Sequence, residues 1–129
     1  MQKILSEISL GELLDKISIL EIKLKKIKNR DKILLVKKEY KSLKKTKNKI
    51  KVKKEINNLY KKLKKTNQKL WNIEDKIRKH EKQKKFNKKF IILARSVYQQ
   101  NDLRSKIKLE INKIMNSNIV EVKSYSKYS

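Results

Sequence analysis

Apolar residues recur at alternating steps of four and three along most of this chain, and this spacing constrains the fold more than any other feature. Such spacing places the apolar side chains on one stripe of an α-helix, the stripe that packs against a neighbour. Proline is absent from the 129 residues and glycine occurs once, so long helices meet few interruptions. The longest pattern spans about four heptads and consists of Val52, Ile56, Leu59, Leu63, Thr66, Leu70, Ile73, Ile77 and His80.

Three further stripes of the same kind predict three more helices. Ser9 and Glu12 form a capping box in front of the first, and Asp31 and Asn87 are the expected N-caps of the second and fourth. The tail, residues 116–129, is expected to be partly extended or frayed. The predicted helices cover about 10–28, 32–47, 52–83 and 88–115.

These helices could form either an extended coiled-coil dimer or a bundle in which the chain folds back on itself. A parallel dimer would place lysine against lysine along residues 52–83, and these charges repel. A bundle lets the acidic first helix cover a basic one, and short connections favour antiparallel neighbours. We therefore predict an all-α fold: a compact antiparallel bundle of about four helices in a single domain, residues 1–129, with a long third helix and a short C-terminal tail.

The formal net charge of +25 is concentrated in the middle of the chain. The net charge is −2 over residues 1–22, +18 over 23–69 and +9 over 70–129. Blocks of like charge often mark nucleic-acid-binding arms, but this middle segment keeps its apolar stripe, which indicates a solvated helix face. Lys, Ile and Asn make up 62 of the 129 residues, and all three have AT-rich codons. We infer that mutational bias contributes much of the lysine content.

Several classes of protein are disfavoured by what the sequence lacks. Without cysteine there are no disulfides or thiolate metal sites, and a single histidine cannot build a zinc site. The N-terminus carries acids inside its apolar run, unlike a signal peptide, and no stretch approaches the roughly 20 apolar residues of a membrane span. The expectation is a cytoplasmic protein with no membrane span, no cofactor and no metal. The sequence contains neither a recognisable set of catalytic nucleophile and base nor a phosphate-binding loop. An enzyme is therefore the less favoured interpretation.

Arginine is the exception within this lysine-rich background, because only four of the 38 basic residues are arginine. If surface arginines drift to lysine, those that remain are the ones that need a planar guanidinium with five donors. Arg30 falls at a predicted helix break. Arg78, Arg95 and Arg104 fall in two blocks poor in lysine, 70–78 and 90–104, that also hold the only Trp and the only Ala.

Polar residues in these blocks form stripes on the predicted helices. Four of them, beginning at Trp71, are spaced i, i+3, i+4 and i+7, so they share one side of the third helix. Glu21 lies among apolar residues of the first helix, and its burial would require a cation, such as Arg78 or Arg104. The candidate ligand-binding residues are Asp15, Lys16, Glu21, Trp71, Glu74, Asp75, Arg78, Arg95, Tyr98, Asn101 and Arg104.

Two interpretations of this group stay open. It could be a buried salt-bridge network that fixes the helix register, since such networks need no ligand. It could instead line a pocket between helices, where guanidinium groups would bind a phosphate, carboxylate or sugar phosphate through paired hydrogen bonds. No catalytic pair is expected, because adjacent positions such as Glu74 and Asp75 point about 100° apart on a helix.

Three blocks of the sequence resemble a family of short, uncharacterised bacterial proteins of unknown function. The blocks are GELLDKISILEIK, LWNIEDKIR and LARSVYQQNDLR, and the resemblance covers about residues 10–125. It implies an all-helical fold and a bacterial origin, and it carries over no activity and no catalytic residue.

Two classes of function remain. The first is a small binding or accessory protein that recognises an anionic metabolite, a sugar phosphate or a protein partner through the Arg, Trp and carboxylate residues. The alternative is sequence-independent nucleic-acid binding through the lysine-rich middle segment, which would depend steeply on salt. That segment has only two aromatic residues, Tyr40 and Tyr60, and no known nucleic-acid motif, so the first is preferred. A homodimer through the first helix is compatible with either.

Overall fold

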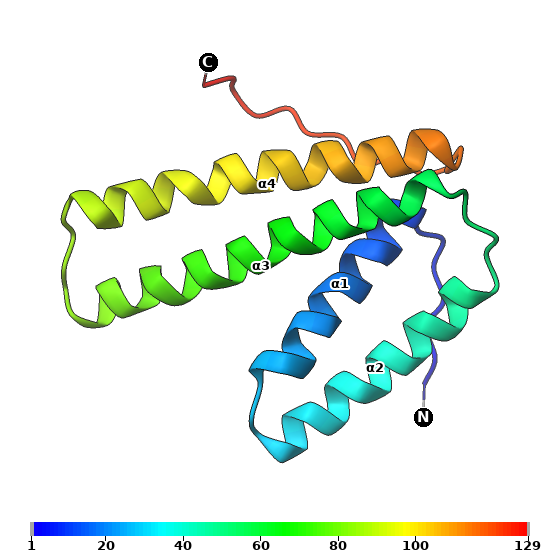
Figure 1. Ribbon diagram of the computed structural model, residues 1–129, viewed down its shortest axis with the longest axis horizontal. Coiled ribbons are helices and arrows are strands. Elements are labelled where there is room, and N and C mark those ends of the chain that lie inside the picture. Colours follow the sequence, from blue (N-terminus) through cyan, green and yellow to red (C-terminus); the bar gives the residue numbers. More distant parts are fainter. Residues whose placement is uncertain (1, 129) are drawn as a thin grey trace.

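Four α-helices follow the predicted stripes in the computed structural model, which describes residues 2–128. They are α1 (Leu10–Lys26), α2 (Arg30–Asn48), α3 (Glu55–Lys82) and α4 (Lys88–Ile114). The predicted all-α bundle with a long third helix is confirmed. Within the described part of the chain there is no strand, and residues 117–128 run back along α4 without regular structure (Figure 1).

The helices are arranged as two antiparallel hairpins of unequal length (Figure 1). α3 and α4 form the long hairpin, and α1 and α2 form the shorter one. α1 contacts all three other helices, whereas α2 contacts only α1. The short hairpin lies beside the end that holds the start of α3 and the end of α4, so the opposite end of the long hairpin projects beyond it (Figure 1).

The hydrophobic core lies where α1 meets the long hairpin. On α3 the buried apolar residues end at Leu63, and on α4 they begin at Ile107. Leucine and isoleucine fill this core because their stripes on the three helices face one another. The core residues are Leu10, Leu13, Leu14, Ile17, Ile56, Leu59, Leu63, Ile107 and Ile111.

Two of the three predicted N-caps are confirmed, and the third is corrected. The side chains of Ser9 and Asn87 accept hydrogen bonds from backbone N–H groups three residues later, as predicted. The Glu12 carboxylate pairs with Lys16 and Lys108, so only the Ser9 half of the expected capping box is formed. The N-cap of α2 is Asn29, not Asp31, and its Oδ1 accepts from Lys32 N at 3.0 Å. Because α1 ends at Lys26, earlier than the stripe indicates, the turn is complete by Asn29. Asp31 then falls in the first turn of α2, where a carboxylate interacts favourably with the helix dipole.

The N-terminus of α1 docks closely on the C-terminal end of α4. Gly11 N donates to Asn112 Oδ1 at 2.7 Å, and Leu10 N donates to Ser117 Oγ at 3.3 Å. These bonds satisfy donors that lack a partner inside the helix. A Cβ on residue 11 would lie 2.7 Å from the backbone oxygen of Lys108 and 2.8 Å from Asn112 Oδ1. The only glycine of the chain therefore permits the close approach of two helices.

Replacing Gly11 with alanine should destabilise the protein, although alanine favours helix. The added methyl group overlaps backbone that cannot move independently, and such overpacking costs about 1–3 kcal/mol. The measurement is the free energy of unfolding from urea titration followed by circular dichroism. Lys16→Ala, on the exposed side of the same helix, is the matched control and should change stability by less than about 0.5 kcal/mol. A Gly11→Ala protein as stable as the wild type would contradict the close contact.

Candidate functional site

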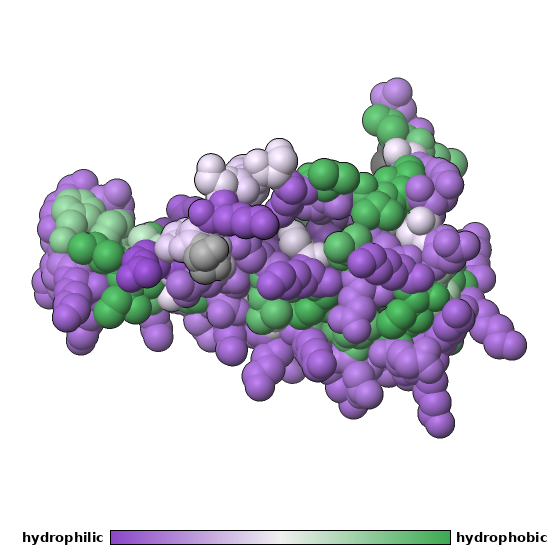
Figure 2. All heavy atoms as spheres, turned by 90° about the horizontal axis from the view of Figure 1, so that it is seen from above, coloured by the Kyte–Doolittle hydropathy of each residue, from purple (hydrophilic) through white to green (hydrophobic). Residues whose placement is uncertain are grey.

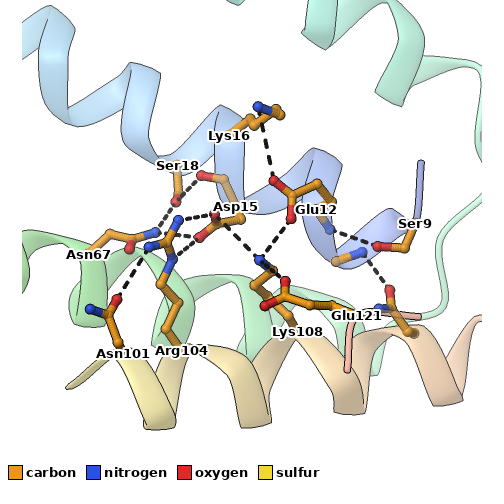
Figure 3. Close-up of polar contacts among 12 residues, drawn as sticks. Ser9, Glu12, Asp15, Lys16, Ser18, Asn67, Asn101, Arg104, Lys108 and Glu121 are labelled. Atoms are coloured by element: carbon orange, nitrogen blue, oxygen red, sulfur yellow. Dashed lines mark hydrogen bonds and ion pairs between the residues drawn. The ribbon is translucent and has the colours of Figure 1, made fainter. Parts of the chain in front are cut away.

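The carboxylate of Asp15 on α1 is the centre of the polar contacts between helices. Its side chain is 1% exposed. Asp15 Oδ1 accepts hydrogen bonds from Asn67 Nδ2 of α3 at 2.9 Å and from Arg104 Nε of α4 at 2.8 Å. Asp15 Oδ2 accepts from Arg104 Nη2, so the guanidinium binds both carboxylate oxygens (Figure 3). One buried charge therefore joins three helices.

Neighbouring groups complete the hydrogen bonding around this pair. Asn67 Nδ2 also donates to Ser18 Oγ at 2.8 Å, and Ser18 Oγ donates to the backbone oxygen of Asp15 at 2.7 Å (Figure 3). Arg104 Nη1 donates to Asn101 Oδ1 at 3.4 Å. Both oxygens of the buried Asp15 carboxylate thus have hydrogen-bond partners, as burial of a charge requires.

Lys108 extends the contacts to the C-terminal tail. It lies one helical turn after Arg104, and its Nζ is 2.8 Å from Glu12 Oε2 and 3.0 Å from Glu121 Oε2 (Figure 3). Asp15 Oδ2 is 3.9 Å away. The tail is therefore attached to the bundle by an ion pair. We refer to Glu12, Asp15, Ser18, Asn67, Asn101, Arg104, Lys108 and Glu121 as the Asp15 network.

The network keeps Asp15 ionised. Burial alone raises the pKa of this carboxyl group, but hydrogen bonds from Arg104 and Asn67, with the positive charges of Arg104 and Lys108, outweigh burial and lower the pKa below its ordinary value. The pKa of Arg104 is raised, because its hydrogen bonds to Asp15 outweigh its own desolvation. Both partners are therefore charged near neutral pH.

A groove of about 500 Å³ opens beside this network, between α3 and α4 and next to α1. Asn67, Asn101 and Arg104 belong to both the network and the groove, so the buried charge pair holds one side of the groove in place. Leu70 and Ile19 add apolar wall. The lining residues, which we call the Trp71 groove, are Ile19, Asn67, Leu70, Trp71, Glu74, Asp75, Arg78, Asn101 and Arg104.

The charged residues on the α3 side of the groove are much more exposed than Arg104. Arg78 Nε lies 3.6 Å from Glu74 Oε2, and Asp75 Oδ2 lies 3.5 Å from Lys79 Nζ. The Arg78 side chain is 80% exposed, compared with 29% for Arg104. Exposed pairs of this kind bind weakly and exchange partners readily. Arg78 is thus free to turn towards a bound group, whereas Arg104 is fixed.

Six of the eleven candidate residues lie together at this groove. The spacing of the stripe on α3 and the polar positions on α4 were sufficient to locate them. Asp15 lies directly behind the groove as the partner of Arg104. The six are Trp71, Glu74, Asp75, Arg78, Asn101 and Arg104.

Glu21 belongs to a different cluster, and the prediction that Arg78 or Arg104 neutralises it is wrong. Its carboxylate accepts hydrogen bonds from Tyr60 Oη and, at 2.9 Å, from Tyr40 Oη, and it lies 3.4 Å from Lys64 Nζ. Two phenol groups and one lysine satisfy this carboxylate, so no arginine is needed. This contact connects α1, α2 and α3.

The other three candidates lie apart from the groove. Arg95 Nε donates to Tyr98 Oη at 3.4 Å on the exposed side of α4, and Tyr98 also packs on Tyr128 with ring centres 5.0 Å apart. Lys16 is exposed and lies 4.0 Å from a carboxylate oxygen of Glu12. Two of the three arginines, Arg78 and Arg104, therefore line one groove, whereas Arg95 lies apart from them.

Sequence reasoning missed four members of the Asp15 network: Ser18, Asn67, Lys108 and Glu121. Asn67 comes directly after Thr66, the polar residue within the apolar stripe of α3. Lys108 lies four residues after Arg104 and therefore on the same side of α4. These positions are signals in the sequence that could have identified both residues. Thr66 itself is satisfied within α3, where its Oγ1 donates to Lys62 O at 2.9 Å. Ser18 has no distinguishing pattern.

The fold and the groove define an all-α bundle with a polar cleft at the junction of three helices. The chain belongs to a family of unknown function (DUF6165), whose model matches residues 4–128. Comparison with curated proteins and with solved structures gave no match. None of the helices described is both long and apolar enough to cross a membrane. The expected membership of a family of unknown function is confirmed, and the bacterial origin stays a prediction.

Replacing Arg104 and Arg78 in turn by lysine should show that the buried ion pair with Asp15 contributes more to stability than the exposed ion pair with Glu74. Arg104→Lys keeps the charge but loses the two-bond contact with a buried carboxylate, so we expect a loss of about 1–3 kcal/mol in the free energy of unfolding. Arg78→Lys should change it by less than about 0.5 kcal/mol. Urea unfolding of both variants is the measurement. Equal costs would show that the Asp15 pair contributes no special stability.

The stabilisation by Asp15 should be lost in acid. Because the pKa of Asp15 is lower in the folded than in the unfolded state, where it is about 3.9, its contribution is complete above about pH 5 and falls as pH drops towards the folded pKa. Asp15→Asn should cost about 2–4 kcal/mol at pH 7. The difference between the unfolding free energies of wild type and Asp15→Asn should become smaller below about pH 4.

Unfolding free energies of wild type and Asp15→Asn, measured from pH 7 to pH 3, test this. Asp75→Asn removes a carboxylate that is 64% exposed and serves as the control, with a difference below about 0.5 kcal/mol at pH 7. A cost of Asp15→Asn that stays constant down to pH 3 would contradict the assignment.

Proposed function

We propose that this protein is a small helical binding protein whose Trp71 groove holds a ligand with both hydroxyl groups and an anionic group, as a sugar phosphate has. The proposal rests on the observation that Trp71, two arginines, two asparagines and two carboxylates surround one open groove. Tryptophan and arginine are scarce in this chain, which has one Trp and four Arg, so their presence in one groove is a distinctive feature.

The groove has the size and lining of a site for a small molecule. Ligand sites commonly measure about 300–1,000 Å³ and combine apolar walls with a few polar groups. Trp71 and Leu70 offer an apolar surface on which the carbon face of a sugar ring can pack. Carboxylate and amide oxygens accept hydrogen bonds from hydroxyl groups, and guanidinium and amide N–H groups donate to them.

The charges of the groove favour a mixed ligand over a simple anion. Its lining carries two positive and two negative side chains, so a bare anion would meet repulsion from Glu74 and Asp75. Hydroxyl groups, in contrast, can use the carboxylates as acceptors. The net charge of +25 attracts anions to the protein as a whole, and Arg78 is exposed enough to turn towards a phosphate.

Asp15 would act in this site as a positioning residue. It occupies Arg104 Nε and Nη2, so Nη1 is the part of the guanidinium that extends to Asn101, which also lines the groove. A fixed donor loses little entropy when a ligand binds. Four other candidates, Lys16, Glu21, Arg95 and Tyr98, lie outside the groove and take no part in the proposal.

Nucleic-acid binding through the lysine-rich segment has less support. Stacking on aromatic rings is the usual source of affinity for single strands. The two aromatic residues of residues 23–69, Tyr40 and Tyr60, both direct their hydroxyl groups to Glu21 and are partly buried. Only the charge of the lysines remains to favour this function.

Trp71 is the only tryptophan, so its fluorescence reports directly on the groove. Titration with glucose 6-phosphate should give a saturable change, whereas glucose and inorganic phosphate should bind at least about tenfold more weakly, equivalent to about 1.4 kcal/mol each. Arg78→Lys should weaken binding of glucose 6-phosphate by a similar factor because the paired hydrogen bonds are lost.

Arg95→Lys is the matched control, because it makes the same change outside the groove and should leave the affinity unchanged. Arg78→Lys is preferred to Arg104→Lys as the test variant, since it should not alter stability. The absence of a saturable response to glucose 6-phosphate would refute the proposed ligand class. Equal weakening by Arg95→Lys would move the site away from the groove.

A further inference from the structure

The free end of the long hairpin combines exposed apolar side chains with a cluster of lysines. We call residues 80–92, which include the connection between α3 and α4, the hairpin tip. It lies at the end of the molecule farthest from α1 and α2, where no other element covers it (Figure 1). The core that the three helices share does not extend to this end, since the last buried residue of α3 is Asn67.

The backbone at the tip places an aromatic ring at the bend. Lys84 adopts a left-handed conformation with φ of 55°, and Lys85 N donates to His80 O at 2.9 Å, which ends α3 sharply. α4 begins after Asn87, so Phe86 lies between the two helices in the turn itself. The ring of Phe86 is supported edge-on by Phe90, with ring centres 5.2 Å apart.

The apolar residues of the tip remain open to solvent. Phe86 is 54% exposed, and Ile91 and Ile92 are each 55% exposed. In Figure 2 apolar atoms gather at the left end of the molecule, surrounded by hydrophilic side chains. A group of exposed large apolar side chains on a projecting element indicates an interaction surface.

The charge of the tip selects the partner. Five lysines lie within it, and its one carboxylate, Glu81, lies 3.8 Å from Lys84 Nζ. A second copy of this chain would bring an equally positive tip into contact and would be repelled. An anionic partner is required, and the tip is a projecting end with which a broad surface can make contact.

An anionic lipid surface matches both properties. Phenylalanine and isoleucine side chains insert at the boundary between headgroups and acyl chains, while lysine stems lie along that boundary and keep their ammonium groups among the lipid phosphates. Clusters of four to eight basic residues are typical of such contacts. We propose that the hairpin tip docks this protein on the surface of an anionic membrane, with Phe86 inserted and its lysines bound to lipid headgroups.

The experiment is co-sedimentation of the full chain with vesicles of phosphatidylcholine mixed with phosphatidylglycerol, and with vesicles of phosphatidylcholine alone. Binding should occur on the mixed vesicles and be at least about tenfold weaker on the neutral ones. Phe86→Ser should weaken binding to the mixed vesicles by about tenfold. Leu35→Ser removes a side chain that is 69% exposed on α2 and should leave binding unchanged.

Two variants that each lose four positive charges test whether the hairpin tip itself binds the membrane or whether the positive charge of the whole protein is sufficient. The tip variant carries Lys82→Gln, Lys85→Gln, Lys88→Gln and Lys89→Gln. The control variant carries Lys37→Gln, Lys38→Gln, Lys41→Gln and Lys45→Gln, all exposed on α2. Only the tip variant should lose most of its binding to the mixed vesicles. Equal losses from both would overturn the proposal and indicate non-specific attraction between polycations and anions.

A fluorescent probe tests insertion directly. In a Trp71→Phe background, Phe86→Trp should shift its emission to the blue with mixed vesicles and not with double-stranded DNA. A blue shift with DNA alone would assign the tip to nucleic acid and refute the membrane. Absence of any shift, or binding that survives Phe86→Ser, would also refute insertion. Circular dichroism of each variant checks that the helices are retained.

Discussion

The burial of one negative charge determines how this bundle assembles. A carboxylate on the face of α1 that packs against the long hairpin is unstable in an apolar core unless cations and donors surround it. Arg104 and Asn67 meet that requirement from two different helices, so the position of α1 relative to the hairpin is fixed by hydrogen-bond geometry. Leucine and isoleucine contacts supply most of the favourable energy, but they would tolerate several registers. We infer that the buried pair favours one of these registers.

The elements of the fold could be predicted from the sequence because local physics determines them. The apolar spacing located the four helices, and short polar side chains located the starts at Ser9 and Asn87. The unequal hairpins could not be predicted, because all four stripes consist mainly of leucine, isoleucine and valine. Nothing in their spacing reveals that α2 contacts α1 alone. That outcome depends on contacts such as Gly11 with Asn112, between residues that are far apart in the sequence.

The candidate site was predictable to the extent that it lies on one helix. Spacing of three and four placed Trp71 and Arg78 on one side of α3, and both line the groove. The partner of Arg104 was not predictable, since Glu21 and Asp15 both interrupt apolar stretches of α1. The structure separates them by their partners: phenol groups and a lysine surround Glu21, whereas a guanidinium surrounds Asp15. Pairing across helices is a tertiary property that a stripe on one helix does not encode.

The attachment of α2 to α1 alone has a consequence for how the molecule opens. α2 has one buried residue, Val36, and its hydrogen-bonded contact with the rest of the bundle is Tyr40 with Glu21. Tyr40 and Leu43 of α2 pack on the edge of the core, but detachment of α2 would leave the Asp15 pair intact. We therefore expect the free energy of this local unfolding to be smaller than that of global unfolding. We therefore expect backbone amide exchange and proteolytic cleavage to be faster in α2 than in the three helices that share the core.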